Sequence, residues 1–139
     1  MKINYENLVT WKQSTDYLRC TPKFHDRPRY DSVIVETVNG PIFAILICIF
    51  DYNIEDRKYP TALIQPCDAP TGRLRKKDVD LHFLRVRSRP RNRAEFISLR
   101  SIVRGALLVP AFDKDEEYLV LDVVDADMFV RVRKMHNFW

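Results

Sequence analysis

The sequence predicts a mainly β fold: a small, mostly antiparallel β-barrel or strongly bent sheet of about seven strands, with a short helix at each end. Seven short segments are enriched in β-branched and aromatic residues, and the dipeptide Asn39-Gly40, typical of a hairpin turn, separates the first two. The chain has 139 residues, of which 46% are hydrophobic and only three are glycine. This composition fits one globular domain with one core, and seven short strands imply a closed or nearly closed sheet.

The beginning of the chain predicts a helix and then an extended lead-in. Residues 5–19 contain neither glycine nor proline, and Leu8, Trp11, Thr15 and Leu18 fall at helical spacing, so one short helix against the core is expected. Residues 21–29 hold two prolines and charges of alternating sign, which favour an extended connector.

The middle of the chain predicts the strands. Residues 30–38 and 42–50 are expected to pair as a hairpin across Asn39-Gly40. Between residues 66 and 80, two prolines and a glycine among charged residues indicate a long exposed loop, a kind of segment that often carries function. The other expected strands are residues 59–65, 81–87, 95–99, 105–109 and 117–124.

The end of the chain predicts a helix. Asp125 or Asp127 can cap its amino end, and three basic residues, Arg131, Arg133 and Lys134, fall toward its carboxyl end. Both charge placements complement the helix dipole. The chain is therefore expected to form a single domain, residues 1–139, with a helix and extended lead-in at 1–29, a β-barrel core at 30–124 and a helix at 125–139.

Charge is distributed unevenly along the chain. The net charge is +4, but the segment 73–104 carries a local balance of +8 and the segment 113–127 a balance of −6. Two interpretations remain open. The basic segment forms a binding face for an acidic partner, or the two segments form solvated faces that pair with each other.

Five arginines recur at every second position, so in an extended chain they project from one side at intervals of roughly 7 Å. Guanidinium groups engage phosphate oxygens two at a time, and a row of them suits a polyanion backbone. Together with this row, basic residues of the preceding loop could enclose a positively charged groove. The alternative is an edge strand that charge and Pro90 protect from aggregation. The predicted nucleic-acid-binding residues are Arg73, Arg75, Lys76 and Lys77 in the loop and Arg85, Arg87, Arg89, Arg91 and Arg93 in the row.

A second candidate site consists of aromatic residues around the ends of the first three predicted strands, namely Tyr30, Phe50, Tyr52 and Tyr59. Small barrels that recognise methylated lysine build aromatic cages at such places. Core packing is the alternative explanation of the same residues.

Catalytic and metal-binding patterns are weak. The three histidines are scattered, no two cysteines are closer than nineteen residues, and no serine or cysteine lies in a glycine-rich elbow. We therefore expect no enzyme activity, no metal site and no cofactor. Asp122, near Asp125 and Asp127, could belong to a magnesium-dependent nuclease site, but helix capping explains these residues as well.

The chain is expected to act inside the cell. No secretory signal is visible, and three cysteines at wide spacings suit free thiols in a reducing compartment. The longest apolar run, residues 42–50, is about half the length of a membrane-spanning helix, so no membrane partner is expected.

Several strings in the chain resemble known proteins. Those that include DYLRCTPKFHDRPRYDSVIV, ALIQPCDAPTG and YLVLDVVDADMFVRV look like the C-terminal region of large transposon-associated (Plavaka-type) proteins of mushroom-forming fungi. This resemblance implies a context of mobile DNA and the nucleus. A second similarity, to bromo-adjacent homology domains, is carried by YDSVIV, FAIL and ISLRSIVRG and implies a chromatin-associated β fold.

These observations predict a non-enzymatic binding module of the nucleus. Its partner is expected to be nucleic acid, as duplex DNA bound independently of sequence, or a chromatin protein. The alternative is a protein-interaction or structural accessory domain of a larger transposon-derived protein.

Overall fold

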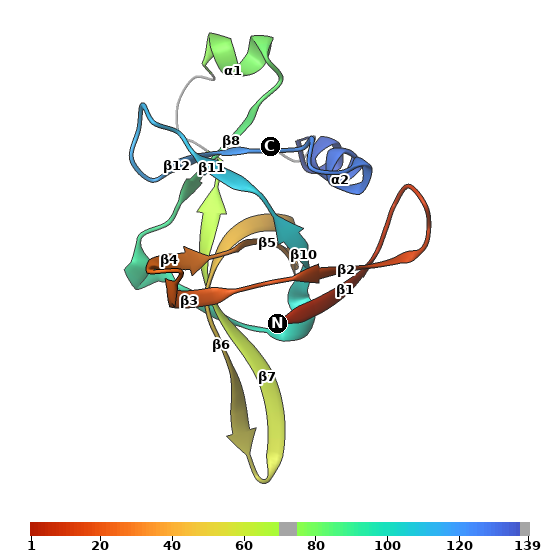
Figure 1. Ribbon diagram of the computed structural model, residues 1–139, viewed down its shortest axis with the longest axis vertical. Coiled ribbons are helices and arrows are strands. Elements are labelled where there is room, and N and C mark those ends of the chain that lie inside the picture. The colour runs from red at the N-terminus through yellow and green to blue at the C-terminus, as the bar shows by residue number, and fades with distance from the viewer. Residues whose placement is uncertain (70–74, 137–139) are drawn as a thin grey trace.

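A computed structural model describes residues 1–69 and 75–136 and confirms a mainly β fold with antiparallel strands and two α-helices (Figure 1). The helices are α1 (Lys76–Asp80) and α2 (Ala126–His136), and two 3₁₀ helices are η1 (Arg91–Arg93) and η2 (Leu99–Ser101). The strands are β1 (Lys2–Glu6), β2 (Gln13–Tyr17), β3 (Cys20–Phe24), β4 (Arg27–Tyr30), β5 (Ser32–Thr37), β6 (Gly40–Ile54), β7 (Arg57–Asp68), β8 (Leu84–Ser88), β9 (Glu95–Ser98), β10 (Ile102–Ala106), β11 (Leu108–Pro110) and β12 (Glu117–Val120).

The main sheet has eight strands and is not a closed barrel. Its order is β10-β5-β6-β7-β8-β12-β11, and β9 pairs with β7 beside this path. The two edge strands, β10 and β11, are separated along the chain by Leu107 alone. Because β10 and β11 follow each other along one extended stretch of chain, they cannot pair with each other. The sheet therefore bends until its two edges meet at Leu107, but no hydrogen bonds between the edge strands close it. The expected barrel is wrong in this respect.

The expected N-terminal helix is wrong. Residues 2–17 form a hairpin in which Lys2 lies opposite Tyr17 and Glu6 opposite Gln13. The side chain of Asn7 accepts hydrogen bonds from the backbone N–H groups of Val9 and Thr10, which stabilises a turn where the helix was expected. Trp11, expected against the core, lies in this turn and is 71% exposed.

The expected extended connector is also a hairpin, formed by β3 and β4. His25 and Asp26 both have positive φ, of 48° and 66°. This is the backbone of a two-residue type I′ turn. The turn was hidden in the sequence because it contains no glycine.

The hairpin predicted around residue 39 is confirmed as β5–β6, with its turn shifted by one residue. Thr37 pairs with Gly40, so Val38 and Asn39 form the loop and Gly40 follows it with a φ of +107°. The Thr37 hydroxyl fixes this loop because it donates to the Gly40 carbonyl at 2.6 Å and accepts from the Asn39 N–H at 3.2 Å.

The strands β6 and β7 form a hairpin far longer than expected, which projects from the body of the molecule (Figure 1). Its turn, Glu55-Asp56, again has positive φ at both residues.

After β7, the loop expected at 66–80 is shorter than predicted, because β7 continues to Asp68 and α1 begins at Lys76. Arg73 lies outside the described residues.

Three other expected strands differ in their bounds. The strand expected at 81–87 begins only at Leu84, because Leu81–Phe83 form the turn that follows α1. The strand expected at 105–109 is split at Leu107 into parts of β10 and β11, and the strand expected at 117–124 ends at Val120.

The core lies on both faces of the sheet. Val33 and Val35 of β5 pack on one face with Ile3 and Leu18 from the N-terminal segment. Ile34, between them, packs on the other face against residues of β8 and α2 such as Met128. All three β5 residues are buried, as expected for a strand covered on both sides. Within the described ranges, no helix is long and apolar enough to cross a membrane.

Candidate nucleic-acid interface

The predicted row of five arginines is broken in the structure. In β8, Leu84, Val86 and Ser88 are buried, so Arg85 and Arg87 point to the opposite face. The strand then ends at Ser88, and Arg91 and Arg93 lie in η1. The two-residue period applies only to an extended chain, so the expected regular spacing over all five is wrong.

Arg85 is not available to a phosphate. Its guanidinium lies 2.7 Å from Asp78 and 2.9 Å from Glu117, and it also hydrogen bonds to Asp113 at 3.2 Å. The arginine side chain is only 10% exposed, and both near carboxylates are buried as well. Hydrogen bonds to Asp78 and Glu117 raise the pKa of Arg85 further, although burial opposes its charge. Arg85 is therefore the centre of a structural ion cluster.

Arg75 and Arg89 are paired too. Arg75 contacts the carboxylate of Asp113. Arg89 donates two hydrogen bonds, of 2.7 and 2.8 Å, to Asp68 and a longer one, of 3.4 Å, to Glu95. The bond to Arg89 lowers the pKa of Asp68, as expected for a two-pronged pair. Asp113 and the Glu117 beside Arg85 both belong to the acidic segment 113–127, so the two oppositely charged segments pair with each other in part, as one of the two interpretations expected.

Five of the predicted basic residues are exposed and form no ion pair with a carboxylate of the described residues. Lys76 and Lys77 lie on α1, Arg87 on β8, and Arg91 and Arg93 on η1. Arg87 and Arg93 lie near one carboxylate at the end of β7, because Arg87 is opposite Asp68 in the register of β7 and β8 and Arg93 contributes to the positive potential at Asp68. Arg91 lies two residues before Arg93 in η1. We refer to Arg87, Arg91 and Arg93 as the basic surface.

The β3–β4 hairpin adds to this surface, and the sequence did not reveal it. The Arg91 guanidinium lies over the Tyr30 ring at 5.6 Å, which joins η1 to β4. The guanidinium groups of Arg19, which precedes β3, and of Arg29 on β4 both lie over the Phe24 ring, at 5.0 and 4.9 Å, and Arg29 is also paired with Asp31 at 2.9 Å. The signal for Phe24 and Arg29 was the alternating charge at 21–29, which we interpreted as a connector.

The four predicted cage residues do not come together. Phe50, Tyr52 and Tyr59 share one face of the β6–β7 hairpin, because Tyr52 lies opposite Tyr59 and Phe50 is two residues from Tyr52. Tyr30 lies elsewhere, against Arg91. Its place beside Phe50 is taken by Phe96 of β9, whose ring meets Phe50 edge-to-face at 5.8 Å. A single cage made of all four predicted residues is therefore not formed.

The aspartates considered for a magnesium site are held by an arginine instead. Arg104 of β10, 4% exposed, contacts Asp127 at 2.8 Å and Asp125 at 2.9 and 3.0 Å. Asp125 also caps α2, because it accepts a hydrogen bond of 2.7 Å from the N–H of Met128. The predicted capping is confirmed. Asp122 lies apart from this cluster, 4.0 Å from Arg133.

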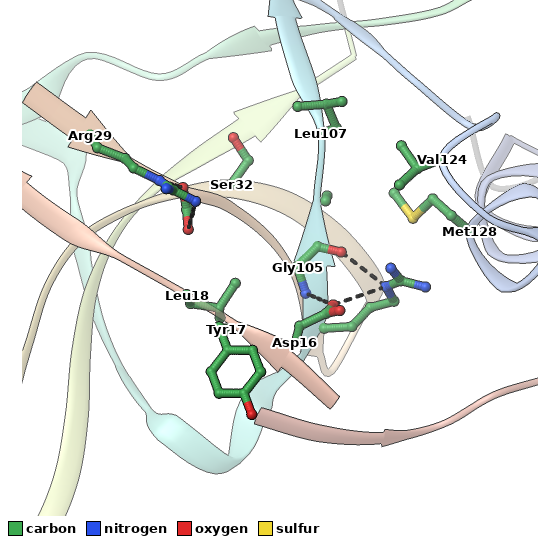
Figure 2. Close-up of a pocket in the computed structure, with 12 residues that line it drawn as sticks. Asp16, Tyr17, Leu18, Arg29, Ser32, Gly105, Leu107, Val124 and Met128 are labelled. Atoms are coloured by element: carbon green, nitrogen blue, oxygen red, sulfur yellow. Dashed lines mark hydrogen bonds and ion pairs between the residues drawn. The ribbon is translucent and has the colours of Figure 1, made fainter. Parts of the chain in front are cut away.

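This buried cluster joins three distant parts of the chain. Asp127 accepts a hydrogen bond of 2.6 Å from the N–H of Leu8, and Asp16 lies 3.4 Å from Arg104. A pocket of about 270 Å³ adjoins the cluster (Figure 2). Figure 2 shows Asp16 beside Gly105 on one side and Val124 and Met128 on another. The charged groups that line the pocket are paired with one another, so they are not free for a ligand.

Acid is expected to destabilise the fold through two of these aspartates. Hydrogen bonds from Arg104 hold the pKa of Asp125 below its ordinary value of 3.8. Burial alone raises the pKa of Asp127, but hydrogen bonds from Leu8, Arg104 and Arg131 outweigh it, so this pKa is also lowered. With lowered pKa values, the folded state binds fewer protons than the unfolded state. Their contribution to stability is complete well above pH 3.8 and decreases as the pH falls through the lowered values. Urea unfolding midpoints at about pH 7 and about pH 3 measure the loss, and equal midpoints contradict it.

The three cysteines are free thiols, as expected. Cys67 is the buried one, and burial raises its pKa to about 12, so it behaves as a small core residue. Cys48, inside the apolar run 42–50, is half-buried.

Comparison of the chain with models of protein families, with curated proteins and with solved structures finds no match at any of the three levels.

Proposed function

We propose that this domain is a non-enzymatic binding module that contacts the phosphate backbone of duplex DNA through the basic surface. The observation that carries the proposal is the state of Arg87, Arg91 and Arg93. All three are exposed, and none forms an ion pair with a described carboxylate, although Arg85 and Arg89 in the same segment are paired. Guanidinium groups that form no ion pair with a carboxylate remain available to phosphate.

The neighbouring hairpin extends this contact surface. Lys23 and Arg27 are exposed on β3 and β4, and Arg91 connects the hairpin to η1 through Tyr30. Backbone contacts of this kind position a protein on a duplex without reading its bases. We therefore propose binding that is independent of sequence and sensitive to salt.

The same proposal places the module in the nucleus, as an accessory domain of a larger transposon-derived protein or of chromatin. It rests on the resemblances of the sequence. An accessory module needs no catalytic residues of its own, and two of the three carboxylates considered for a magnesium site, Asp125 and Asp127, are paired with Arg104.

Duplex binding should depend on η1. The double change Arg91→Ala and Arg93→Ala is expected to weaken binding of a short DNA duplex by about tenfold at low salt and to lower the slope of log Kd against log salt by about two. Both side chains are exposed, so the melting temperature should hardly change. Fluorescence anisotropy between about 50 and 200 mM salt measures both quantities.

The matched control removes two positive charges elsewhere. Lys2 and Lys12 are exposed on the N-terminal hairpin, and the Lys2→Ala, Lys12→Ala protein should lose much less affinity. The proposal fails if the unchanged protein does not bind duplex at low salt, or if both double variants lose affinity equally.

A further inference from the structure

The long β6–β7 hairpin presents a continuous aromatic face to solvent. Residues that lie opposite each other in an antiparallel pair share a face, so Tyr52 and Tyr59 point the same way. Phe96 joins them because it lies opposite Leu63, an even number of residues along β7 from Tyr59. Phe96 is 68% exposed, Tyr52 56% and Tyr59 46%. Several large rings exposed on one face are typical of a surface that binds another molecule.

A groove lies beside these rings, where two strands diverge. Thr61 of β7 pairs with Ser98 of β9, and beyond this pair the chain of β9 turns into η2 while β7 continues into the hairpin. The groove has a volume of about 480 Å³ and lies between Tyr59 and Phe96.

The charges at the groove are all positive. Lys58 and Arg100 line it, no carboxylate does, and neither cation forms an ion pair with a described carboxylate. On the aromatic face itself, Arg57 lies opposite Ile54 near the hairpin tip. The groove thus combines ring surfaces with cations that form no ion pair among the described residues, which suits an occupant that is negatively charged and flat.

We infer that this groove binds single-stranded nucleic acid, with bases stacked on Phe96 and Tyr59 and with phosphates near Lys58 and Arg100. Unpaired bases expose flat faces that stack on aromatic side chains, and the backbone supplies the negative charge. A methylated lysine fits less well, because its cation would meet Lys58 and Arg100 without a carboxylate to balance it. A duplex fits less well too, because its bases are already stacked.

This site goes beyond the proposed contact with duplex DNA and is carried by different residues. The basic surface lies on β8 and η1, whereas the groove is lined by residues of β7, β9 and η2. The two sites can therefore fail or succeed independently.

The test measures binding of an oligothymidylate of about 15 nucleotides to the full chain by fluorescence anisotropy. Phe96→Ala is expected to weaken this binding by about tenfold, which is the scale of one lost stacking contact. Phe96→Tyr should restore it, because the ring remains. Binding of duplex DNA should stay unchanged in both variants, whereas the Arg91→Ala, Arg93→Ala protein should lose duplex binding.

Phe112 provides the matched control. It is 97% exposed in a turn outside the groove, so Phe112→Ala removes an exposed ring without touching the site. The inference is overturned if the unchanged protein does not bind the oligonucleotide, or if Phe96→Ala and Phe112→Ala have equal effects. It is also overturned if Phe96→Ala instead abolishes self-association in sedimentation, which would make the face an interface between copies. Loss of duplex binding alone would overturn only the proposed function.

Discussion

Replacement of Arg104 by methionine should lower the free energy of unfolding by about 3–5 kcal/mol, the largest effect we expect of any single charge. The Arg104 side chain is 4% exposed and is held by Asp125, Asp127 and, less closely, Asp16. Methionine fills similar space but leaves Asp127, which is 0% exposed, with one arginine fewer. A buried carboxylate without its partner is costly because it has also lost its water. Urea unfolding at neutral pH measures the difference.

Two further variants separate the effect of losing the positive charge from the effect of losing the paired N–H groups of the guanidinium. Arg104→Lys keeps the charge but cannot reach Asp125 and Asp127 with paired N–H groups, so an intermediate loss is expected. Arg131→Met should cost less than Arg104→Met, because Arg131 contacts Asp127 at 2.8 Å but is more exposed and leaves Arg104 in place. A loss below about 1 kcal/mol for Arg104→Met would contradict the structural role of the cluster.

The cluster shows what local sequence patterns can and cannot predict. Aspartate capping of the C-terminal helix was predictable, because a cap acts on an N–H three residues away. The bond from Leu8 to Asp127 was not predictable, because it joins residues 119 positions apart. No local pattern encodes such a pairing, and the same aspartates were equally consistent with a metal site.

The β5–β6 hairpin was predicted because its side chains alternate or form a buried run, although β6 extends further than expected, and the number of strands was underestimated. The N-terminal hairpin was missed because Leu8 and Trp11 happen to fall at helical spacing, whereas the Asn7 side chain stabilises a turn there. Two hairpin turns were hidden because His25-Asp26 and Glu55-Asp56 adopt positive φ without glycine. In each case a local side-chain bond or the pairing of strands outweighed the residue preference on which the prediction rested.

The candidate interface was predictable in composition but not in geometry. The regular spacing of the arginines was real in the sequence, yet its meaning depended on where β8 ends and on which carboxylates lie nearby. Asp78 lies within seven residues of Arg85 but was assigned to an exposed loop, so its buried pair with Arg85 could not be anticipated. The aromatic face that includes Phe96 was missed because Phe96 reaches Tyr52 and Tyr59 only through the pairing of β9 with β7, which the sequence does not reveal.

Arg85 and Arg87, two residues apart on one strand face, should behave in opposite ways when each is changed to alanine. Arg85→Ala is expected to lower the free energy of unfolding by about 2–4 kcal/mol, because Asp78 loses its partner among the described residues while buried. Glu117 suffers less, since Lys114 lies 3.8 Å and Arg75 4.0 Å away. Arg87→Ala should change stability by less than about 0.5 kcal/mol, because Arg87 is exposed and forms no ion pair with the described carboxylates.

The same pair of variants tests whether the basic segment is divided into structural and binding residues. If the basic surface contacts phosphate, Arg87→Ala weakens duplex binding and reduces its salt dependence by about one unit of slope while the fold stays intact. Arg85→Ala should reduce stability and, at temperatures where it remains folded, leave the affinity for duplex nearly unchanged. Thermal unfolding and anisotropy on both proteins give the four values needed. Equal stability of the two variants would mean that the ion pairs around Arg85 do not stabilise the fold. A larger loss of duplex affinity for Arg85→Ala than for Arg87→Ala would place the interface at Arg85 and α1 instead of Arg87 and η1.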